Sequence, residues 1–331
     1  RWQGPEIAAG THKPGNSSGT AQSVGQLSFI HDRGSGQMKL LDCVSEVEQQ
    51  LQHAKLYFGH GTDNAHDEAA WLVMAASGIN VGTFDGDWTQ ELSVQQLAET
   101  EKLILKRIHS RQPLAYILNS AWFAETEFYI DERAIVPRSH IGEWIPECFE
   151  PWLDPTGVQD VLDLCTGGGC IAVALALVLD QARFDAVDIS TDALAVAAIN
   201  ARRHAVSDRI RLIQSDLFTA LPDRRYDLIL CNPPYVADQL MDELPLEYSH
   251  EPEIAFSGGS DGLTLIRQVL AESRAHLTQG GLLVVEAGSA ALSVERAWPT
   301  VPFTWLMSAN GESVVFVLSA DELDAYGQRF V

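Results

Sequence analysis

Short apolar runs alternate with longer helical stretches across the second half of this sequence. Five runs rich in Val, Ile and Leu have the length of strands, at 158–164, 184–188, 210–215, 226–230 and 281–286. Stretches of helical character lie between several of them, at 170–179, 192–204 and 263–277. Continuous apolar strands that alternate with helices are typical of βαβ units, in which a parallel sheet is buried on both faces. The pattern therefore predicts an α/β fold built on a parallel sheet.

The last two apolar runs depart from this pattern. They lie at 303–307 and 314–318 and are separated by Ser308–Ser313, a segment that contains Asn310-Gly311. Such a segment between two apolar runs is a hairpin signal. The sequence therefore predicts an antiparallel pair that closes an otherwise parallel sheet, which is unusual among plain dinucleotide-binding domains.

Residues 38–120 have a helical period instead. Six apolar residues fall on one face of a first helix: Leu40, Val44, Val47, Leu51, Ala54 and Phe58. A second helix is predicted over 65–76, with Asp63 as its cap and Gly78 as its end. A third is predicted from Val94 to Ile108, ended by Pro113. These residues are expected to form a small helical domain.

Short extended segments at 122–123, 128–130 and 134–137 follow the helical part. They predict a hairpin-like linker and a connecting helix over 121–157, which leaves 158–331 as the domain that contains the sheet. Residues 1–37 are rich in Gly, Ser, Thr and Gln and have no helical or strand period. Such a segment buries too little apolar surface to offset its ordering entropy, so we expect a disordered leader or translated sequence upstream of Met38.

The charge balance is strongly acidic. The chain has 22 Lys and Arg residues against 45 Asp and Glu residues, a net charge of −23. Residues 1–37 contribute three basic and two acidic residues, so the acidity belongs to the remainder. This balance disfavours direct binding to DNA or RNA phosphates and favours a basic protein partner, although acidity by itself also aids solubility.

The sequence gives no sign of a membrane or an oxidising compartment. Its longest fully apolar run, 170–179, is shorter than the ~20 residues of a membrane-spanning helix. No basic stretch followed by an apolar one opens the chain, so no secretory signal is visible. The five cysteines form no C-x-x-C pair, which suggests neither a disulfide framework nor a zinc site. We therefore expect a cytoplasmic protein without a metal.

A glycine-rich turn follows the first strand of the sheet. The segment Asp163–Ile171 ends a strand, has three consecutive glycines and begins an apolar helix. Glycines allow a ligand to approach the backbone, and a helix N-terminus favours acceptor groups. Asp188 lies nineteen residues past Gly169, where its carboxylate can accept hydrogen bonds from both ribose hydroxyls. A nucleotide-type cofactor is indicated, and both NAD and S-adenosylmethionine remain open, because Gly167-x-Gly169-x-x-Ala172 also fits the dinucleotide fingerprint.

Two further segments follow the third and fourth strands. Asp216 and Leu217 end the third strand, where the carboxylate either accepts from an adenine amino group or caps a helix. Asn232-Pro233-Pro234-Tyr235 follows the fourth strand. The prolines fix φ and remove two backbone donors, so the chain leaves the sheet stiffly with exposed carbonyl groups. A rigid turn explains the prolines but neither the amide before them nor the aromatic ring after them.

These motifs together resemble a known enzyme class. D-x-x-T-G-x-G at Asp163–Gly169, an acidic residue about 20 positions later, and N-P-P-Y after the fourth strand are similar to class I S-adenosylmethionine-dependent methyltransferases that methylate planar, non-basic nitrogens. The resemblance implies a seven-stranded Rossmann-like α/β domain, preceded by a helical substrate-recognition domain, and S-adenosyl-L-methionine as cofactor. The expected cofactor-binding residues are Asp163, Thr166, Gly167, Gly169, Asp188, Asp216, Leu217 and Asn232.

The segments that flank these motifs resemble one family within this class of methyltransferases. His250–Ala255 and Gly258–Leu263 look like the E-P-x-x-A…G-G-x-D-G-L stretch of the protein-(glutamine-N5) methyltransferases HemK, PrmC and PrmB, and the linker Arg133–Arg138 is similar too. Residues 57–64 and 121–123 resemble the PrmB branch, which modifies large-subunit ribosomal protein L three. Ser139–Glu143 departs from the release-factor branch, which usually has an acidic residue and then Thr-Glu after Pro-Arg. The resemblance covers Leu40 to Phe330.

The resemblance also implies a mechanism. Asn232 and Pro233 are expected to accept the two hydrogens of a glutamine side-chain amide through a side-chain oxygen and a carbonyl oxygen, and Tyr235 is expected to pack against the planar amide. The competing hypotheses are a release-factor glutamine methyltransferase, a nucleic-acid adenine methyltransferase, and a catalytically silent cofactor-binding scaffold for ribosome assembly. The intact N-P-P-Y argues against the scaffold, and the acidity argues against the nucleic-acid enzyme.

Overall fold

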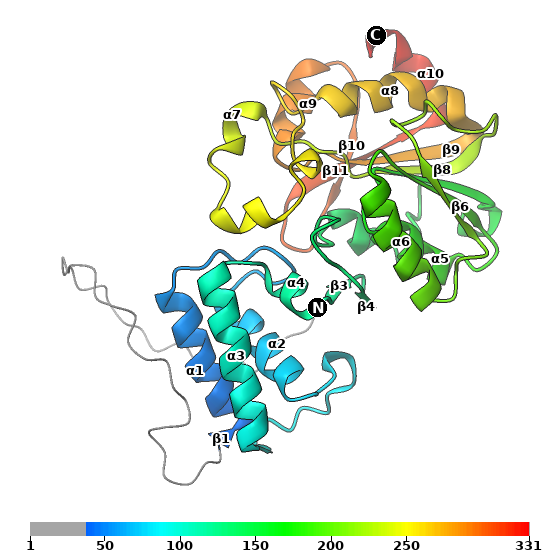
Figure 1. The fold of residues 1–331 in the computed structure, drawn as a ribbon. Coiled ribbons are helices and arrows are strands. Elements are labelled where there is room, and N and C mark those ends of the chain that lie inside the picture. Colours follow the sequence, from blue (N-terminus) through cyan, green and yellow to red (C-terminus); the bar gives the residue numbers. More distant parts are fainter. Residues whose placement is uncertain (1–37, 331) are drawn as a thin grey trace. The chain divides into compact units, whose positions relative to one another are not determined.

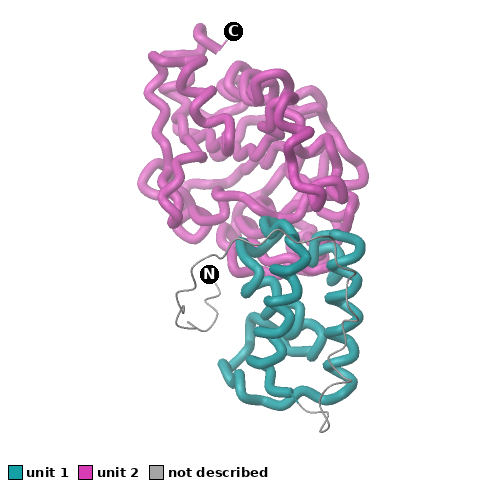
Figure 2. Tube along the Cα trace, turned by 90° about the vertical axis from the view of Figure 1, so that its left-hand side faces the viewer, with its two compact units in different colours: residues 1–118 teal, residues 119–331 magenta. Residues whose placement is uncertain are grey.

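The computed structural model describes residues 38–330, so the predicted leader 1–37 lies outside the described residues. The chain divides after Leu118 into two compact units (Figure 2). Within the described residues, no helix combines the length and the apolar character needed to cross a lipid bilayer.

The first unit is helical. It contains α1 (Leu40–His53), α2 (Ala65–Ala76), α3 (Val94–Ser110) and α4 (Leu114–Leu118), and a two-stranded antiparallel sheet of β1 (Met38–Lys39) and β2 (Glu91–Leu92). A 3-10 turn, η1, spans Val81–Thr83. The three longer helices lie where the apolar spacing predicts them, because α1 and α3 each bury one face against the other helices.

The ends of the helices differ from the prediction in two places. α1 ends at His53, because Lys55 adopts a left-handed φ of 50°, so Phe58 is not on this helix. The cap of α2 is Asn64 and not Asp63: the Asn64 side-chain oxygen accepts a hydrogen bond from the Asp67 backbone N–H at 2.9 Å. Both differences concern local backbone geometry, to which a pattern of apolar residues is insensitive.

The second unit begins with a connecting segment. β3 (Ala121–Phe123) and β4 (Thr126–Phe128) form the expected hairpin. The third extended segment, 134–137, pairs with no strand, and the connecting helix expected before residue 157 is replaced by two 3-10 turns, η2 (His140–Trp144) and η3 (Pro155–Gly157). We refer below to residues 129–140 as the strap.

A seven-stranded sheet forms the centre of the second unit (Figure 1). Its strands are β5 (Asp160–Leu164), β6 (Arg183–Asp188), β7 (Ile210–Gln214), β8 (Tyr226–Cys231), β9 (Leu277–Glu286), β10 (Thr304–Met307) and β11 (Ser313–Ser319). Their order is β10-β11-β9-β8-β5-β6-β7. β5 to β9 are parallel, whereas β11 is antiparallel to both β9 and β10. The predicted α/β class and the closing antiparallel hairpin are confirmed.

Helices cover both faces of this sheet (Figure 1). α5 (Cys170–Val178) and α6 (Thr191–Arg203) lie on one face, and α8 (Thr264–His276), α9 (Ala291–Ala297) and α10 (Ala320–Tyr326) lie on the other. Alternate strand residues supply the two cores, for example Val161 and Leu230 toward α5, and Leu162 and Ile229 toward α8. The remaining short elements are α7 (Asp238–Met241), η4 (Leu246–His250), η5 (Glu253–Ala255), η6 (Gly288–Ala290) and η7 (Gly327–Arg329).

The strand order reverses between β5 and β8. The chain runs from β5 outward through β6 and β7, and then returns to place β8 on the other side of β5. Open α/β sheets bind their ligands at such a switch point, outside the carboxyl ends of the strands. In this sheet, Leu164 and Cys231 pair across β5 and β8, so the glycine turn and Asn232 begin side by side.

Candidate active site

The glycine turn is held by backbone and carboxylate contacts. Its three positive φ angles are 56° at Cys165, 55° at Gly167 and 79° at Gly169. The Thr166 backbone N–H donates to the Val187 carbonyl at 2.9 Å, which ties the turn to β6. The turn therefore has a fixed shape that joins two neighbouring strands.

The glycines in this turn serve different purposes. A Cβ atom on Gly169 would lie 2.9 Å from the Ala197 Cβ, so Gly169 is required where α6 packs against the turn. A Cβ atom on Gly167 would approach nothing nearer than the Ile135 Cγ2 atom at 3.6 Å. Gly167 is thus the position at which a ligand can approach the backbone of the turn.

Asp163 is fully buried beneath the turn. Its Oδ2 atom accepts hydrogen bonds from the Thr166 hydroxyl at 2.5 Å and from the Ala172 backbone N–H at 3.2 Å. Its Oδ1 atom has no hydrogen-bond partner among the described residues. Burial raises the pKa of Asp163 to about 7, although both hydrogen bonds oppose the shift. Asp163 and Thr166 thus support the turn from below.

Asp188 ends β6 beside the turn. Its two oxygens accept hydrogen bonds from the backbone N–H groups of Gly167 at 2.8 Å and Ser190 at 2.9 Å. Burial raises the pKa of its carboxyl group, and these hydrogen bonds oppose the shift. A carboxylate has about four lone-pair sites, so both oxygens keep acceptor capacity for two ribose hydroxyls.

Two further predicted cofactor residues, Asp216 and Leu217, follow β7, the strand next to β6. Asp216 follows β7 and is exposed, and its side chain makes no hydrogen bond with residues 38–330. No helix starts there, so the alternative role as a helix cap is excluded. Leu217 is buried with a positive φ of 43° and packs in the core on the α8 side. Asp216 is therefore available to a ligand, whereas Leu217 anchors its backbone.

Asn232 and Pro233 present unused acceptors. Both follow β8 directly, next to the glycine turn. Among the described residues, none hydrogen-bonds the Asn232 side chain or the Pro233 carbonyl oxygen. Asn232 is half-buried, a position in which an amide group without a partner is costly unless a ligand or solvent satisfies it.

Tyr235 is enclosed by glycines. A Cβ atom on Gly288 would lie 2.3 Å from the Tyr235 ring, one on Gly262 would lie 2.4 Å from the Tyr235 carbonyl oxygen, and one on Gly258 would lie 2.8 Å from the Tyr235 Cα. The Tyr235 hydroxyl donates to Glu286 Oε1 at 3.3 Å. Burial, followed by the charge of Glu286, raises the pKa of the Tyr235 hydroxyl, so it stays protonated. The ring is thereby fixed at the end of β8.

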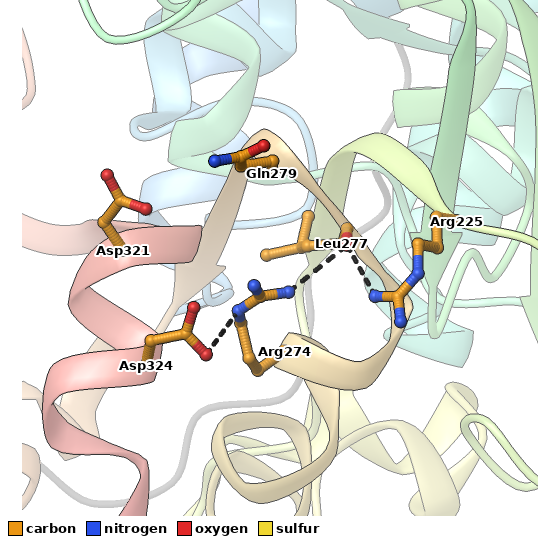
Figure 3. Close-up of a pocket in the computed structure, with 6 residues that line it drawn as sticks. All are labelled: Arg225, Arg274, Leu277, Gln279, Asp321 and Asp324. Carbon is orange, nitrogen blue, oxygen red and sulfur yellow. Dashed lines mark hydrogen bonds and ion pairs between the residues drawn. The ribbon is translucent and has the colours of Figure 1, made fainter.

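An open pocket lies at the opposite end of the sheet. It has a volume of about 400 Å³ and lies at the amino ends of β8 and β9 (Figure 3). Arg274 pairs with Asp324 at 2.7 Å, and Arg225 donates to the Leu277 backbone carbonyl at 2.9 Å. Because it lies at the opposite end of the strands from Asn232, this pocket is not the candidate active site. Its lining residues are Arg225, Arg274, Leu277, Gln279, Asp321 and Asp324.

Comparison with known proteins agrees with this geometry. The family model described as Methyltransferase small domain matches residues 149–245, and the PrmC N-terminal domain model matches residues 48–118. The ribosomal protein uL3 glutamine methyltransferase of Francisella tularensis is 45% identical over 280 residues, covering 83% of this chain and 88% of the relative. The Burkholderia pseudomallei enzyme of the same name is 42% identical over 292 residues, covering 86% and 95%. The chain belongs to the ribosomal protein uL3 glutamine methyltransferase family.

Membership of this family confirms several predictions. The resemblance to the PrmB branch of protein-glutamine methyltransferases is confirmed, and the cofactor is S-adenosyl-L-methionine rather than NAD. Among solved structures, the hMettl16 catalytic domain in complex with an RNA hairpin is similar with a TM-score of 0.45 and 18% identity, covering 66% of this chain and 80% of that one. The residues of the turn fit the cofactor, because Gly167 is open and Asp188 and Asp216 have unused acceptors.

The candidate site also contains a residue that the sequence did not single out. Glu286, at the end of β9, is 2% exposed and accepts hydrogen bonds from the Ser139 hydroxyl at 2.5 Å and the His140 backbone N–H at 3.0 Å, besides that from Tyr235. Burial raises its pKa, and Ser139 and His140 oppose the shift. Glu286 thus joins the strap to residues 232–236, which we call the catalytic loop. A glutamate at the end of an apolar strand was the only available signal.

Proposed function

We propose that this chain transfers a methyl group from S-adenosylmethionine to the side-chain amide nitrogen of a glutamine in ribosomal protein uL3. The observation that carries the proposal is Asn232-Pro233, with two free acceptors, directly beside the glycine turn in a chain 45% identical to a uL3 glutamine methyltransferase. Five relatives at 40–45% identity carry that name.

Orientation of the amide is the main task of the site. An amide nitrogen is a weak nucleophile, because its lone pair is delocalised into the carbonyl group. The Asn232 side-chain oxygen and the Pro233 carbonyl oxygen accept the two amide hydrogens, which aims the nitrogen at the methyl group. The same acceptors stabilise the positive charge that develops on the nitrogen during transfer. S-adenosylmethionine, when bound, supplies an electrophilic methyl group on a positively charged sulfur.

Tyr235 completes the amide site. Its ring packs against the planar face of the glutamine amide, which limits rotation of the side chain. Gly288 lies against the ring, and Glu286 accepts a hydrogen bond from its hydroxyl, so the ring is held in one position. On the cofactor side, Gly167 and Gly169 belong to the glycine turn, and Asp163 and Thr166 keep its shape. Asp188 ends β6 beside the turn, and Asp216 and Leu217 follow β7.

The substrate and the location follow from the same proposal. The helical unit contributes to docking of uL3, and the acidic surface attracts this basic partner. Direct DNA binding is disfavoured by the net charge of −23. The reaction takes place in the cytoplasm, where ribosomal proteins are made.

The test is methylation of purified uL3. Wild-type enzyme with uL3 and S-adenosylmethionine is expected to add the mass of one methyl group to a glutamine-containing peptide, as read by tandem mass spectrometry. A release factor and a DNA duplex serve as competing substrates in parallel reactions. Methylation of either of these with uL3 unmodified would overturn the assignment.

A further inference from the structure

Two segments are similar to stretches of the protein-glutamine methyltransferases but have no role in the proposed chemistry: the linker Arg133–Arg138 and His250–Ala255. They contact each other in the structure. Arg138 lies in the strap, and Glu251 lies 113 residues later, after the catalytic loop. The Arg138 Nη1 and Nη2 atoms donate to the two Glu251 oxygens at 2.9 Å and 2.7 Å, and the Val136 backbone N–H donates to Glu251 Oε1 at 2.8 Å. This is a two-pronged ion pair with a further backbone bond.

The guanidinium of Arg138 is also enclosed by aromatic rings. It lies 5.2 Å from the ring centroid of Tyr248 and 5.6 Å from that of Phe256. The Glu251 side chain is fully buried, and that of Arg138 is 25% exposed. A planar guanidinium makes fork and stacking contacts together, which an ammonium group does not reproduce. Arg138 therefore fixes three residues of the segment that follows the catalytic loop.

That segment is hydrogen-bonded to the catalytic loop itself. The backbone N–H of Val236, the residue after Tyr235, donates to the Phe256 carbonyl at 2.9 Å. The Gly258 backbone N–H donates to the Val236 carbonyl at 2.8 Å. Phe256 thus touches Arg138 through its ring and the catalytic loop through its backbone, so a shift of either is passed to the other.

The first part of the strap, residues 129–135, lies against the glycine turn. The Ile135 Cγ2 atom is the nearest neighbour of the Gly167 Cβ position, at 3.6 Å, and Ile130 and Ala134 lie at 3.5 Å and 3.8 Å from that of Gly168. The Asn200 side-chain amide donates to the carbonyl groups of Tyr129 and Gly168, which fastens the strap there. The strap therefore spans from the turn that binds the methyl donor to the loop that binds the acceptor.

We propose that Arg138 is a positioning residue for methyl transfer. Through Glu251 and Phe256, it fixes the position of the catalytic loop relative to the glycine turn. The inference rests on the proposed function, because the positioned groups are Asn232 and Tyr235. Arg138 touches neither reacting group in this scheme. Its effect is on kcat rather than on cofactor affinity, because the turn keeps its own contacts through Asp163, Asp188 and Asn200.

The test uses variants that distinguish an effect on the position of the catalytic loop from an effect on the stability of the fold. Arg138→Met alone removes the Arg138 ion pair from the buried Glu251 carboxylate, which destabilises the fold. The decisive variant is therefore the double change Arg138→Met with Glu251→Gln, which removes both charges. We expect it to lower kcat on uL3 at least about tenfold, with the dissociation constant of S-adenosylhomocysteine within about threefold of wild type. Arg138→Lys keeps the charge without the fork, and we expect an intermediate kcat and a melting temperature closer to wild type than that of Arg138→Met.

Arg133→Met is the matched control. Arg133 lies in the same strap and pairs with Asp131 through two nitrogens, at 2.9 Å and 2.6 Å, and among the described residues it has no hydrogen bond to the segment after the catalytic loop. Its kcat is expected to stay within about twofold of wild type. A wild-type kcat in Arg138→Lys and in the folded double variant would overturn the positioning role while leaving the proposed function intact. No methylation by the wild-type enzyme would overturn both.

Discussion

At the scale of single residues, two carboxylates at the glycine turn differ in what they bind. Asp188 has acceptor capacity beyond its two backbone bonds, whereas Asp163 is fully buried and turned into the fold. The sequence assigns both to the cofactor site, Asp163 as the first residue of the D-x-x-T-G-x-G motif and Asp188 as the acidic residue that ends the next strand. Their difference in burial depends on the packing of α5 and β6, which the local sequence does not reveal. Separate variants distinguish the two roles.

Asp188→Ala is expected to weaken binding of S-adenosylmethionine at least about tenfold, because two charge-assisted hydrogen bonds are lost at ~1.5–3 kcal/mol each. Asp188→Asn keeps one acceptor and should fall between this variant and wild type. Calorimetric titration provides the affinities, and Asp192→Asn, an exposed change in the same connection, is the control. Unchanged affinity in Asp188→Ala would remove this residue from the cofactor site.

Asp163 predicts a pH dependence of stability. Its pKa is raised from 3.8 to about 7 in the folded protein, so the native state binds the proton more tightly than the unfolded state. Stability from this group is therefore full below about pH 4 and is lost as the pH rises toward about 7, by at most about 4 kcal/mol. Asp163→Asn keeps the hydrogen bonds without the charge. In urea denaturation, the free energy of unfolding of this variant relative to wild type should therefore increase as the pH rises from about 4 to about 7. A difference in unfolding free energy between the two proteins that does not change with pH would contradict the raised pKa of Asp163.

At the scale of elements, the sequence predicted most helices and strands because each has its own apolar period. α2 forms over the predicted 65–76, and β6 and β8 agree to within one residue at each end. The strap was not predictable, because it has no regular period and is fixed by residues more than a hundred positions away, such as Glu251 and Glu286. The sequence predicted that the glycine turn and Asn232 directly follow strands, whereas the strand order that makes them neighbours and the contacts that hold Tyr235 were not predicted.

Gly288→Ala tests the contact between the end of β9 and the catalytic loop. The new Cβ would overlap the Tyr235 ring, so we expect kcat to fall at least about tenfold as the ring is displaced. Gly311→Ala is the control, because Gly311 also has a positive φ, of 86°, but has open space around its Cβ position. It should lose about 1 kcal/mol of stability with normal activity. Equal activity in the two variants would show that Tyr235 does not need its present position.

At the scale of the whole molecule, the acidity is concentrated near the site in the sequence. The segment 226–266, which contains the catalytic loop, has eight acidic residues and neither Lys nor Arg. Three of its exposed carboxylates, Asp238, Asp242 and Glu243, follow Tyr235 closely. Because ribosomal proteins neutralise RNA phosphates and are generally basic, these charges are expected to speed the approach of free uL3.

Association with uL3 is therefore expected to slow several-fold as the ionic strength rises, and assembled large subunits should be poor substrates because their RNA repels the enzyme. Changing Asp238, Asp242 and Glu243 to their amides should reduce both the association rate and its salt dependence. The same change at three exposed carboxylates elsewhere, Asp180, Asp208 and Glu295, is the control. Stopped-flow measurement gives the rates, and salt-independent rates that are equal in all variants would contradict the electrostatic account.

The most direct measurement of the central claim is kcat and cofactor affinity of Asn232→Ala with purified uL3. Because Asn232 orients the acceptor amide, the variant is expected to lose most methyl transfer, while its dissociation constant for S-adenosylmethionine changes by less than about threefold. A kcat within about twofold of wild type would contradict the account, because the amide would then be oriented by other groups.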